Sequence, residues 1–150
     1  MRCRATPLPR PTGPRRCRGL TDLGRRQAAA LGLRLARELA ARLAAIYASI
    51  IPRAIETAQL LAAALGHDEV VQDCGHCTWH SPDHADGMLI ADYHRETGLV
   101  GGGVYRPFQA GNESWSELVG RTGRAFERIA SRHKGQTVVI ATHAEPVKGA

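Results

Sequence analysis

The sequence predicts an α/β layered fold with a mostly parallel sheet, formed by a single domain over residues 1–150. Predicted strands and helices alternate along the chain, which is typical of that class. The last strand, in "QTVVIATH" (136–143), is a continuous apolar run of the kind found in parallel sheets covered by helices on both faces. With 43% apolar residues among 150, the chain can form one packed core.

The N-terminal third predicts an irregular arm followed by a long helix. Residues 1–20 hold four of the eight prolines, which disfavours regular structure there. Thr21 is expected to cap a helix of about twenty residues, with Gly24 and Gly32 as weak points. Its apolar stripe is predicted from leucines at every fourth position: Leu31, Leu35, Leu39 and Leu43.

The next segments predict two strands separated by a helix. "AAIYAS" (44–49) is apolar enough for a buried strand, and "EVVQD" (69–73) favours a second one. Between them, Pro52 suits the first turn of a helix and Gly66 suits its end.

The second half predicts a polar segment, a helix and the final strand. Residues 74–111 are rich in His, Asp and Gly, with a short helix predicted within 87–98 and a glycine loop at 101–103. A longer helix is expected to end at Gly135. Its apolar positions have helical spacing: Trp115, Leu118, Val119, Phe126 and Ile129.

Composition narrows the class of partner. The net charge of +6 comes with only 5% aromatic residues, so an anionic partner such as a small phosphate is favoured and nucleic acid is not expected. No run approaches the roughly 18 apolar residues of a membrane span, and the first residues lack the apolar stretch of a signal peptide. We therefore expect a soluble, cytoplasmic protein with no membrane partner and no disulfide framework.

Candidate site residues follow two of the predicted strands. His143 comes after the last strand, and Ser49 and Arg53 come after the strand at 44–49. Because the carboxyl ends of parallel strands meet at one edge of the sheet, we expect His143 and Arg53 on the same rim. The alternative is that each side chain only packs or caps locally.

Four segments stand in order along most of the chain: "GLTDLGRRQAAALGLRL" (19–35), "IYASIIPRAIETAQLLA" (46–62), "GNESWSELVGR" (111–121) and "VVIATHAEPV" (138–147). Together they resemble the histidine phosphatase family, also called the phosphoglycerate mutase-like family. The resemblance implies a three-layer αβα sandwich that binds or hydrolyses a small phosphomonoester without a cofactor. It also implies that Arg53 binds phosphate and that His143 is the second histidine of the site.

The family's first motif is altered in this sequence. Members carry an Arg-His-Gly triplet whose histidine accepts the phosphoryl group, and "RCRAT" (2–6) stands at a suitable distance before residue 19. Arg2 matches as a phosphate ligand, whereas Cys3 replaces the nucleophilic histidine and Arg4 the glycine. The alternative is a chance match in an arginine-rich arm. Since the strand that precedes the triplet and the C-terminal part of the family are missing, we expect a piece of a longer protein or a shortened relative.

Phosphoryl transfer needs an in-line nucleophile and positive groups around the phosphoryl oxygens. Arg2, Arg53 and His143 could form that cradle, and Cys3 could attack as a thiolate favoured by the flanking arginines. A bulky Arg4 opposes the close backbone approach that cysteine phosphatases use. We therefore expect weak or absent phosphatase activity, and a catalytically inactive phosphate-binding domain is the main alternative.

A proton donor for the leaving group is expected from a substitute carboxylate. The family's glutamate falls near Thr78, where this sequence has none. Glu145 is the first candidate because it lies two residues after His143, although it could simply stabilise the start of a helix. The other candidates are Asp73, Asp83 and Asp86.

The polar middle segment permits other chemistry. Cys74, Cys77, His80 and His84 form the pattern C-x₂-C-x₂-H-x₃-H, a candidate zinc site that could support a zinc-stabilised module. The same "CGHC" is a weaker candidate for redox catalysis.

If the chain is a phosphatase, this segment is expected to form a lid over the pocket. The lid residues available for substrate contacts are His76, Trp79 and His80. The partner is then a small phosphorylated substrate or phosphate, with a homodimer as a candidate assembly.

Overall fold

The structure is a computed structural model that describes residues 17–39, 42–80, 82–85, 87–97, 102–107 and 109–149; of Asp83 and Ile90 it describes the backbone alone. Three of the predicted site residues, Arg2, Cys3 and Asp86, lie outside the described residues. In chain order the elements are α1 (Asp22–Leu39), β1 (Leu43–Ala48), α2 (Pro52–Leu65), β2 (Val71–Gln72), η2 (Cys74–His76), η3 (Asp83–Ala85), α3 (Ile90–Thr97), α4 (Trp115–Arg132), β3 (Thr137–Ala141) and α5 (Ala144–Gly149).

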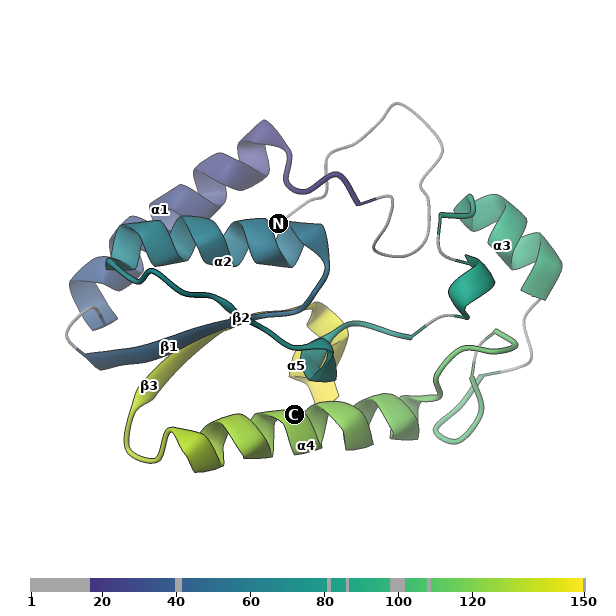
Figure 1. Ribbon diagram of the computed structural model, residues 1–150. Helices are drawn as coiled ribbons and strands as arrows, with labels where there is room; N and C mark the ends of the chain where they lie inside the picture. The colour runs from purple at the N-terminus through teal and green to yellow at the C-terminus, as the bar shows by residue number, and fades with distance from the viewer. Residues whose placement is uncertain are drawn as a thin grey trace.

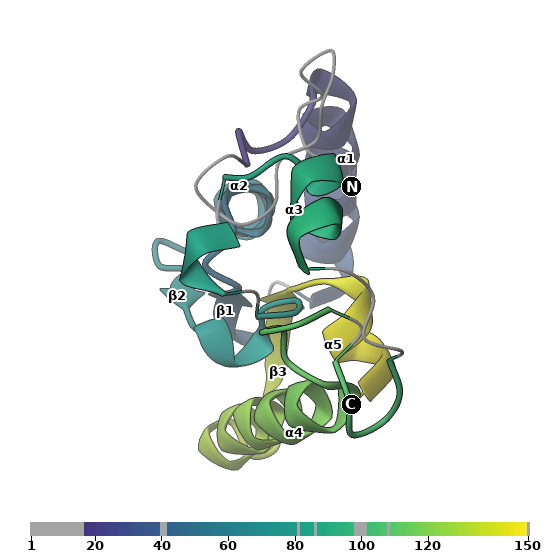
Figure 2. The ribbon, with the colours of Figure 1, turned by 90° about the vertical axis from the view of Figure 1, so that its right-hand side faces the viewer.

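The elements form three layers around a parallel sheet, as predicted. The described sheet has three strands in the order β2-β1-β3, and β1 pairs in parallel with both neighbours. Helices α1 and α2 cover one face, while α4 lies on the opposite face with α5 beside it (Figures 1 and 2). Ala48, the last residue of β1, is in register with Ala141, the last residue of β3. Both strands therefore end at the same edge of the sheet.

The helix that follows β1 begins and ends where the sequence predicts. Pro52 occupies the start of α2, where its missing N–H costs no intrahelical hydrogen bond. Gly66 ends the helix at φ 68°, a left-handed conformation that favours glycine, and its N–H donates to Ala62 O. The main core packs α2 against the sheet. Its buried members are Ile46, Ala48, Ala58, Leu61, Ala62, Leu65 and Ala141.

The buried face of α1 differs from the predicted leucine stripe. Leu35 of the predicted stripe packs against the core, but Leu31 is 37% exposed and Leu43 belongs to β1. The buried positions of α1 are instead Gly24, Ala28 and Gly32. A Cβ atom added at Gly32 would lie 2.8 Å from the Ala64 Cβ of α2, so small residues allow the two helices to approach closely. A repeat of four residues also rotates by about 40° per step around a helix of 3.6 residues per turn, so a strict stripe cannot stay on one face.

The second long helix, α4, is fixed at its start by a capping box. The Ser114 side chain accepts from the Glu117 N–H, and the Glu117 carboxylate accepts from the Ser114 N–H. The predicted apolar positions Leu118 and Ile129 are buried. The helix ends at Arg132, three residues before Gly135. Its length and apolar face are close to the prediction.

The strand that precedes the polar middle segment is shorter than predicted, whereas the helix predicted within the segment is present. Strand β2 spans two residues, Val71–Gln72, rather than the whole of 69–73. The short helix predicted within 87–98 is present as α3. None of the helices in the described part of the chain is both long and apolar enough to cross a bilayer.

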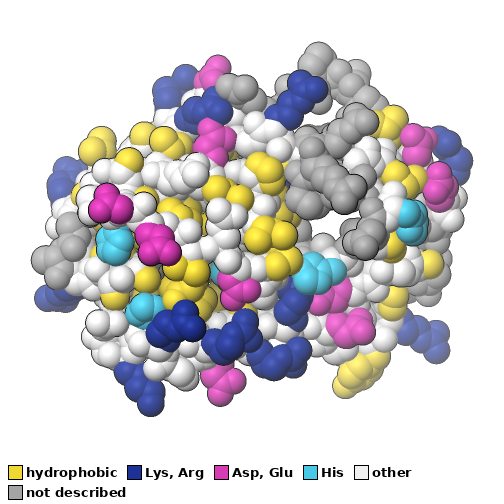
Figure 3. All heavy atoms as spheres, viewed as in Figure 1, with side chains coloured by type: hydrophobic (Ala, Val, Ile, Leu, Met, Phe, Trp, Pro, Cys, Tyr) yellow, Lys and Arg dark blue, Asp and Glu magenta, His cyan; other side chains and the backbone are white. Residues whose placement is uncertain are grey.

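Charged side chains are spread over the helices on the face shown in Figure 3. Lys and Arg side chains gather over α1 and along α4, with Asp and Glu side chains among them. One such pair joins Arg128 of α4 to Asp73 at 3.4 Å. On this face the positive charge is therefore partly balanced.

Candidate active site

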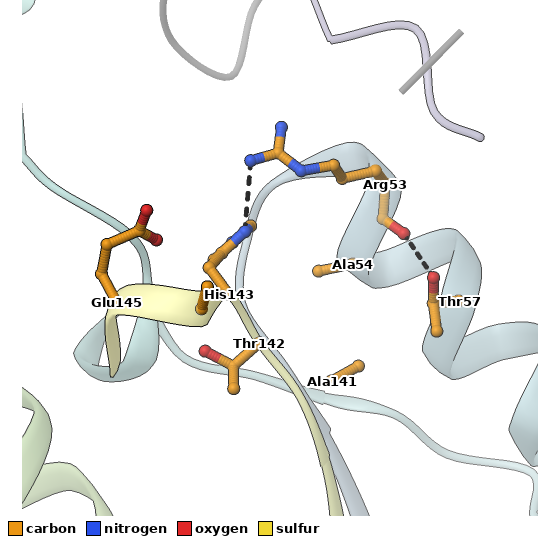
Figure 4. A pocket seen from close by; sticks show the side chains of 8 residues that line it. Arg53, Ala54, Thr57, Ala141, Thr142, His143 and Glu145 are labelled. Carbon is orange, nitrogen blue, oxygen red and sulfur yellow. Dashed lines mark hydrogen bonds between the residues drawn. The ribbon is translucent and has the colours of Figure 1, made fainter. Parts of the chain in front are cut away.

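The structure brings Arg53 and His143 into contact, although 90 positions separate them in the sequence. Arg53 lies in the first turn of α2, directly after β1, and His143 lies between β3 and α5. The Arg53 guanidinium nitrogen NH2 is 3.2 Å from His143 Nδ1, and Figure 4 shows the arginine side chain extending to the imidazole. The predicted rim is therefore present, because the two parallel strands end at the same level of the sheet.

The hydrogen bonds of His143 define its tautomer. A guanidinium can only donate, so Nδ1 accepts from Arg53 and the ring proton lies on Nε2. That Nε2–H donates to Ser49 Oγ, at 2.7 Å. Ser49 is fully buried at the end of β1 and also accepts from Ile51 N, at 3.4 Å. The imidazole is therefore held between the two ends of one strand–helix connection.

His143 is neutral near neutral pH in the absence of a ligand. Burial, together with the nearby Arg53 charge, lowers the pKa of His143 to about 4, while Glu145 opposes the shift and His76 adds to it slightly. An anion between Arg53 and the imidazole would have the opposite effect on the pKa of His143, since it stabilises the protonated ring. Negative charge bound at this pair would therefore raise the pKa of His143.

A cavity of about 410 Å³ opens beside this pair, within the size range of small-molecule sites. One wall comes from the start of α2, where the Thr57 hydroxyl donates to Arg53 O at 2.8 Å. The other wall comes from the turn between β3 and α5. The lining residues are Arg53, Ala54, Thr57, Ala141, Thr142, His143, Ala144 and Glu145.

Glu145 lines this cavity at the start of α5 and contacts the polar middle segment. The Thr78 hydroxyl donates to Glu145 Oε2 at 3.1 Å. Thr78 is the position near which the family glutamate was expected, so the candidate carboxylate Glu145 contacts that position. Asp73, by contrast, accepts from Gly75 N at 2.7 Å and is not among the residues that line the cavity.

The sequence analysis missed an arginine that organises the segment carrying Thr78. Arg121 of α4 donates to the backbone carbonyls of Cys74, Gly75, Cys77 and Thr78 at 2.9–3.2 Å. It also pairs with Glu113 at 2.7 Å, and the two side chains are only 16% and 10% exposed. In the sequence, Arg121 is one of many arginines on an amphipathic helix, so no local signal marks it.

The predicted lid residues have different surroundings from those expected. His76 is fully buried, with its ring stacked on Phe126 at a centroid distance of 6.5 Å, so it cannot contact a substrate. Burial lowers the pKa of His76. Trp79 packs against Trp115, at a centroid distance of 5.8 Å. His80 is exposed and lies beside Cys74.

The chain therefore has an α/β fold in which an Arg–His pair lies at the carboxyl edge of a parallel sheet, beside a small-molecule cavity. Residues 15–150 match the family described as the histidine phosphatase superfamily (branch 1). The chain therefore belongs to that superfamily, as its sequence motifs predicted.

Similar proteins include two from Arabidopsis thaliana. The chain is 32% identical over 133 residues to phosphoglycerate mutase-like protein 4, covering 83% of this chain and 55% of that protein. It is 31% identical over 136 residues to metal-independent phosphoserine phosphatase, covering 83% of this chain and 53% of that protein. The chain thus spans about half the length of these curated relatives.

A solved structure supports the fold. A mycobacterial glucosyl-3-phosphoglycerate phosphatase superimposes with a TM-score of 0.63 at 23% identity, over 87% of this chain and 65% of that one. At this level of identity the likeness establishes the fold alone.

Proposed function

We propose that this chain binds a small phosphomonoester at the Arg53–His143 pair, as a phosphatase-like domain. The observation that carries the proposal is the 3.2 Å contact between the two side chains, which places two cationic or potentially cationic groups at one cavity. Phosphatases among its relatives support the class of reaction, including one named for phosphoserine.

The binding step follows from the hydrogen bonds of the pair. A phosphoryl oxygen that enters between the two side chains replaces the Arg53–Nδ1 hydrogen bond with one bond to each group. Nδ1 then takes up a proton and donates, while Nε2–H keeps its bond to Ser49. The anion exchanges one bond between a cation and a neutral ring for two bonds in which both partners are charged.

Turnover needs a nucleophile and a proton donor besides the binding pair. In the resemblance Cys3 stands at the position of the nucleophilic histidine, so in any turnover a Cys3 thiolate would attack phosphorus while the P–O bond to the leaving group breaks. Glu145 would give its proton to the leaving oxygen, and water would then hydrolyse the phosphocysteine. Because Cys3 replaces the usual histidine and Arg4 the glycine, we expect slow hydrolysis.

The proposal is tested by measuring phosphate binding and aryl phosphate hydrolysis in parallel. We expect Arg53→Ala and His143→Ala to abolish binding and any turnover, while Arg34→Ala, an exposed α1 arginine paired with Glu38, serves as a matched control. Binding that survives both pocket substitutions would refute the proposed function.

The role of Cys3 is tested separately, by comparing two substitutions. If "RCRAT" is the altered triplet, Cys3→His raises the rate of aryl phosphate hydrolysis above that of Cys3→Ala. Equal rates would exclude Cys3 from the phosphoryl-acceptor position. Binding without turnover in every variant would identify an inactive phosphate-binding domain.

A further inference from the structure

A second cluster of reactive side chains lies on the segment that follows β2, outside the cavity. The ligand atoms of Cys74, Cys77 and His80 all lie within 4.8 Å of one another. The closest approach is between Cys74 Sγ and His80 Nε2, at 3.2 Å. None of the three lines the cavity, and Cys77 is linked to the Arg53–His143 pair through a hydrogen bond with Ser49.

The spacing of these atoms suits a tetrahedral metal ion. With zinc–sulfur bonds of about 2.3 Å and zinc–nitrogen bonds of about 2.0 Å, tetrahedral ligands lie about 3.5–3.8 Å apart. Atoms already within 4.8 Å need to move by only about 1 Å to reach that arrangement. Two thiolates and an imidazole are also a donor set that favours zinc over magnesium or calcium.

The predicted fourth ligand is not part of the cluster. Among the described residues, the group comprises Cys74, Cys77 and His80, and His84 is exposed elsewhere on η3. The fourth tetrahedral position is therefore left for a water molecule. Two thiolates balance the charge of a divalent ion, so no further anion is required.

The backbone around the cluster is already held in place by the rest of the fold. Arg121 donates to the carbonyls of both cysteines, at 3.1 and 3.2 Å. Glu113, the partner of Arg121, also accepts from His80 N at 3.3 Å. Outer contacts of this kind orient metal ligands and limit the entropy lost when the ion binds.

A disulfide between the two cysteines is the competing use of this cluster. The two thiols are not joined in the structure, and Cys77 is only 3% exposed. The burial of Cys77 leaves the half-buried Cys74 as the sulfur that an external thiol or disulfide can reach. That burial does not oppose a metal ion that enters from the exposed His80 side.

We propose that Cys74, Cys77 and His80 bind one Zn²⁺ ion, with water as the fourth ligand. The ion would join the two ends of segment 74–80, which carries the Thr78 contact to Glu145. Zinc would therefore stabilise one wall of the cavity without entering the phosphate chemistry.

The test is direct zinc binding by the reduced, metal-free chain, measured by competition with a chromophoric chelator. We expect one zinc per chain, and Co²⁺ in its place should give thiolate-to-metal charge-transfer absorption. Cys74→Ser and His80→Ala should each weaken binding by more than about 100-fold, the upper end of what loss of an outer partner costs. His84→Ala, which removes another exposed histidine of the same segment, should leave binding unchanged.

The two surface-accessible substitutions keep the test independent of Cys77, whose replacement could impair folding. Circular dichroism should show that Cys74→Ser and His80→Ala remain folded. The absence of zinc binding by the reduced wild-type chain would overturn the proposal, as would binding that survives both substitutions. A loss in His84→Ala equal to that in His80→Ala would overturn the three-ligand site.

Discussion

The neutral state of His143 predicts that anion binding at the proposed site weakens as the pH rises. Sulfate is a suitable probe because, unlike phosphate, it stays a dianion throughout the range of interest. In the free chain the pKa of His143 is lowered to about 4, by burial first and by Arg53 second. A bound dianion stabilises the protonated ring and returns its pKa toward or above the ordinary value of about 6.5. Between these two pKa values, binding takes up one proton.

The size of the effect follows from that proton. Each unit of pKa difference corresponds to about 1.4 kcal/mol, or a tenfold change in affinity. With pKa values of about 4 in the free state and about 6.5 in the bound state, sulfate affinity should fall about 15-fold from pH 5 to pH 6.5. Solvent screening in the half-buried cavity reduces this, so we expect a fall of about 5- to 15-fold.

The assay is isothermal titration calorimetry with sulfate at pH 5, 5.75 and 6.5, in two buffers of different ionisation enthalpy. The buffer dependence should report uptake of about 0.9 proton at pH 5, falling to about 0.5 proton at pH 6.5. His143→Gln should remove the pH dependence, whereas Glu145→Gln, which removes the neighbouring carboxylate, should retain it. Sulfate affinity that stays constant over this range in the wild-type chain would refute the assigned protonation state.

Folding stability should depend on the same group, which sets the lower pH limit of the assay. Because its folded pKa lies below the unfolded value, protonation of His143 favours the unfolded chain. Its stabilising contribution is complete above about pH 6.5 and is lost as the pH falls toward 4. Circular dichroism at each pH should confirm that the chain remains folded before binding is measured.

Three further predictions concern the scaffold, and urea denaturation checks all of them. Arg121→Met leaves Glu113 buried without its partner, so we expect a loss of about 3–5 kcal/mol; a loss below about 1 kcal/mol would show that this pair is effectively solvated. Gly123→Ala should stabilise α4 by about 0.5–1 kcal/mol, because a Cβ there meets no atom within 4 Å, and any destabilisation would contradict that open surface. Gly32→Val should destabilise the chain by about 1–3 kcal/mol through contact with Ala64, and a neutral result would mean that α1 can move away from α2.

Local signals in the sequence were sufficient to predict the helix after β1 and the edge of the sheet that carries Arg53 and His143. Pro52 and Gly66 set the ends of α2 through backbone constraints that do not depend on the rest of the chain. The positions of Arg53 and His143 after two parallel strands predicted their meeting, because parallel strands share one carboxyl edge. The four family segments likewise predicted the superfamily.

Other features depend on how closely elements pack, which periodicity does not report. The fully buried positions of α1 were decided by the close approach of Gly32 to α2, whereas Leu35 is only partly buried against the core. The burial of the His76 side chain was decided by the aromatic rings that pack around it, although the sequence suggested this side chain for substrate contacts. In both cases the sequence alone does not distinguish the buried from the exposed side chain, because the difference depends on the neighbouring element.

The polar contacts of segment 74–80 were also decided by the tertiary structure. The sequence shows two cysteines and two histidines at zinc-like spacing, but it cannot tell which of them converge. Docking α4 inserts Arg121 among the segment's carbonyls and leaves His84 outside the cluster. Spacing along the chain determines which side chains are available, whereas convergence on one point depends on the three-dimensional path that packing against α4 imposes.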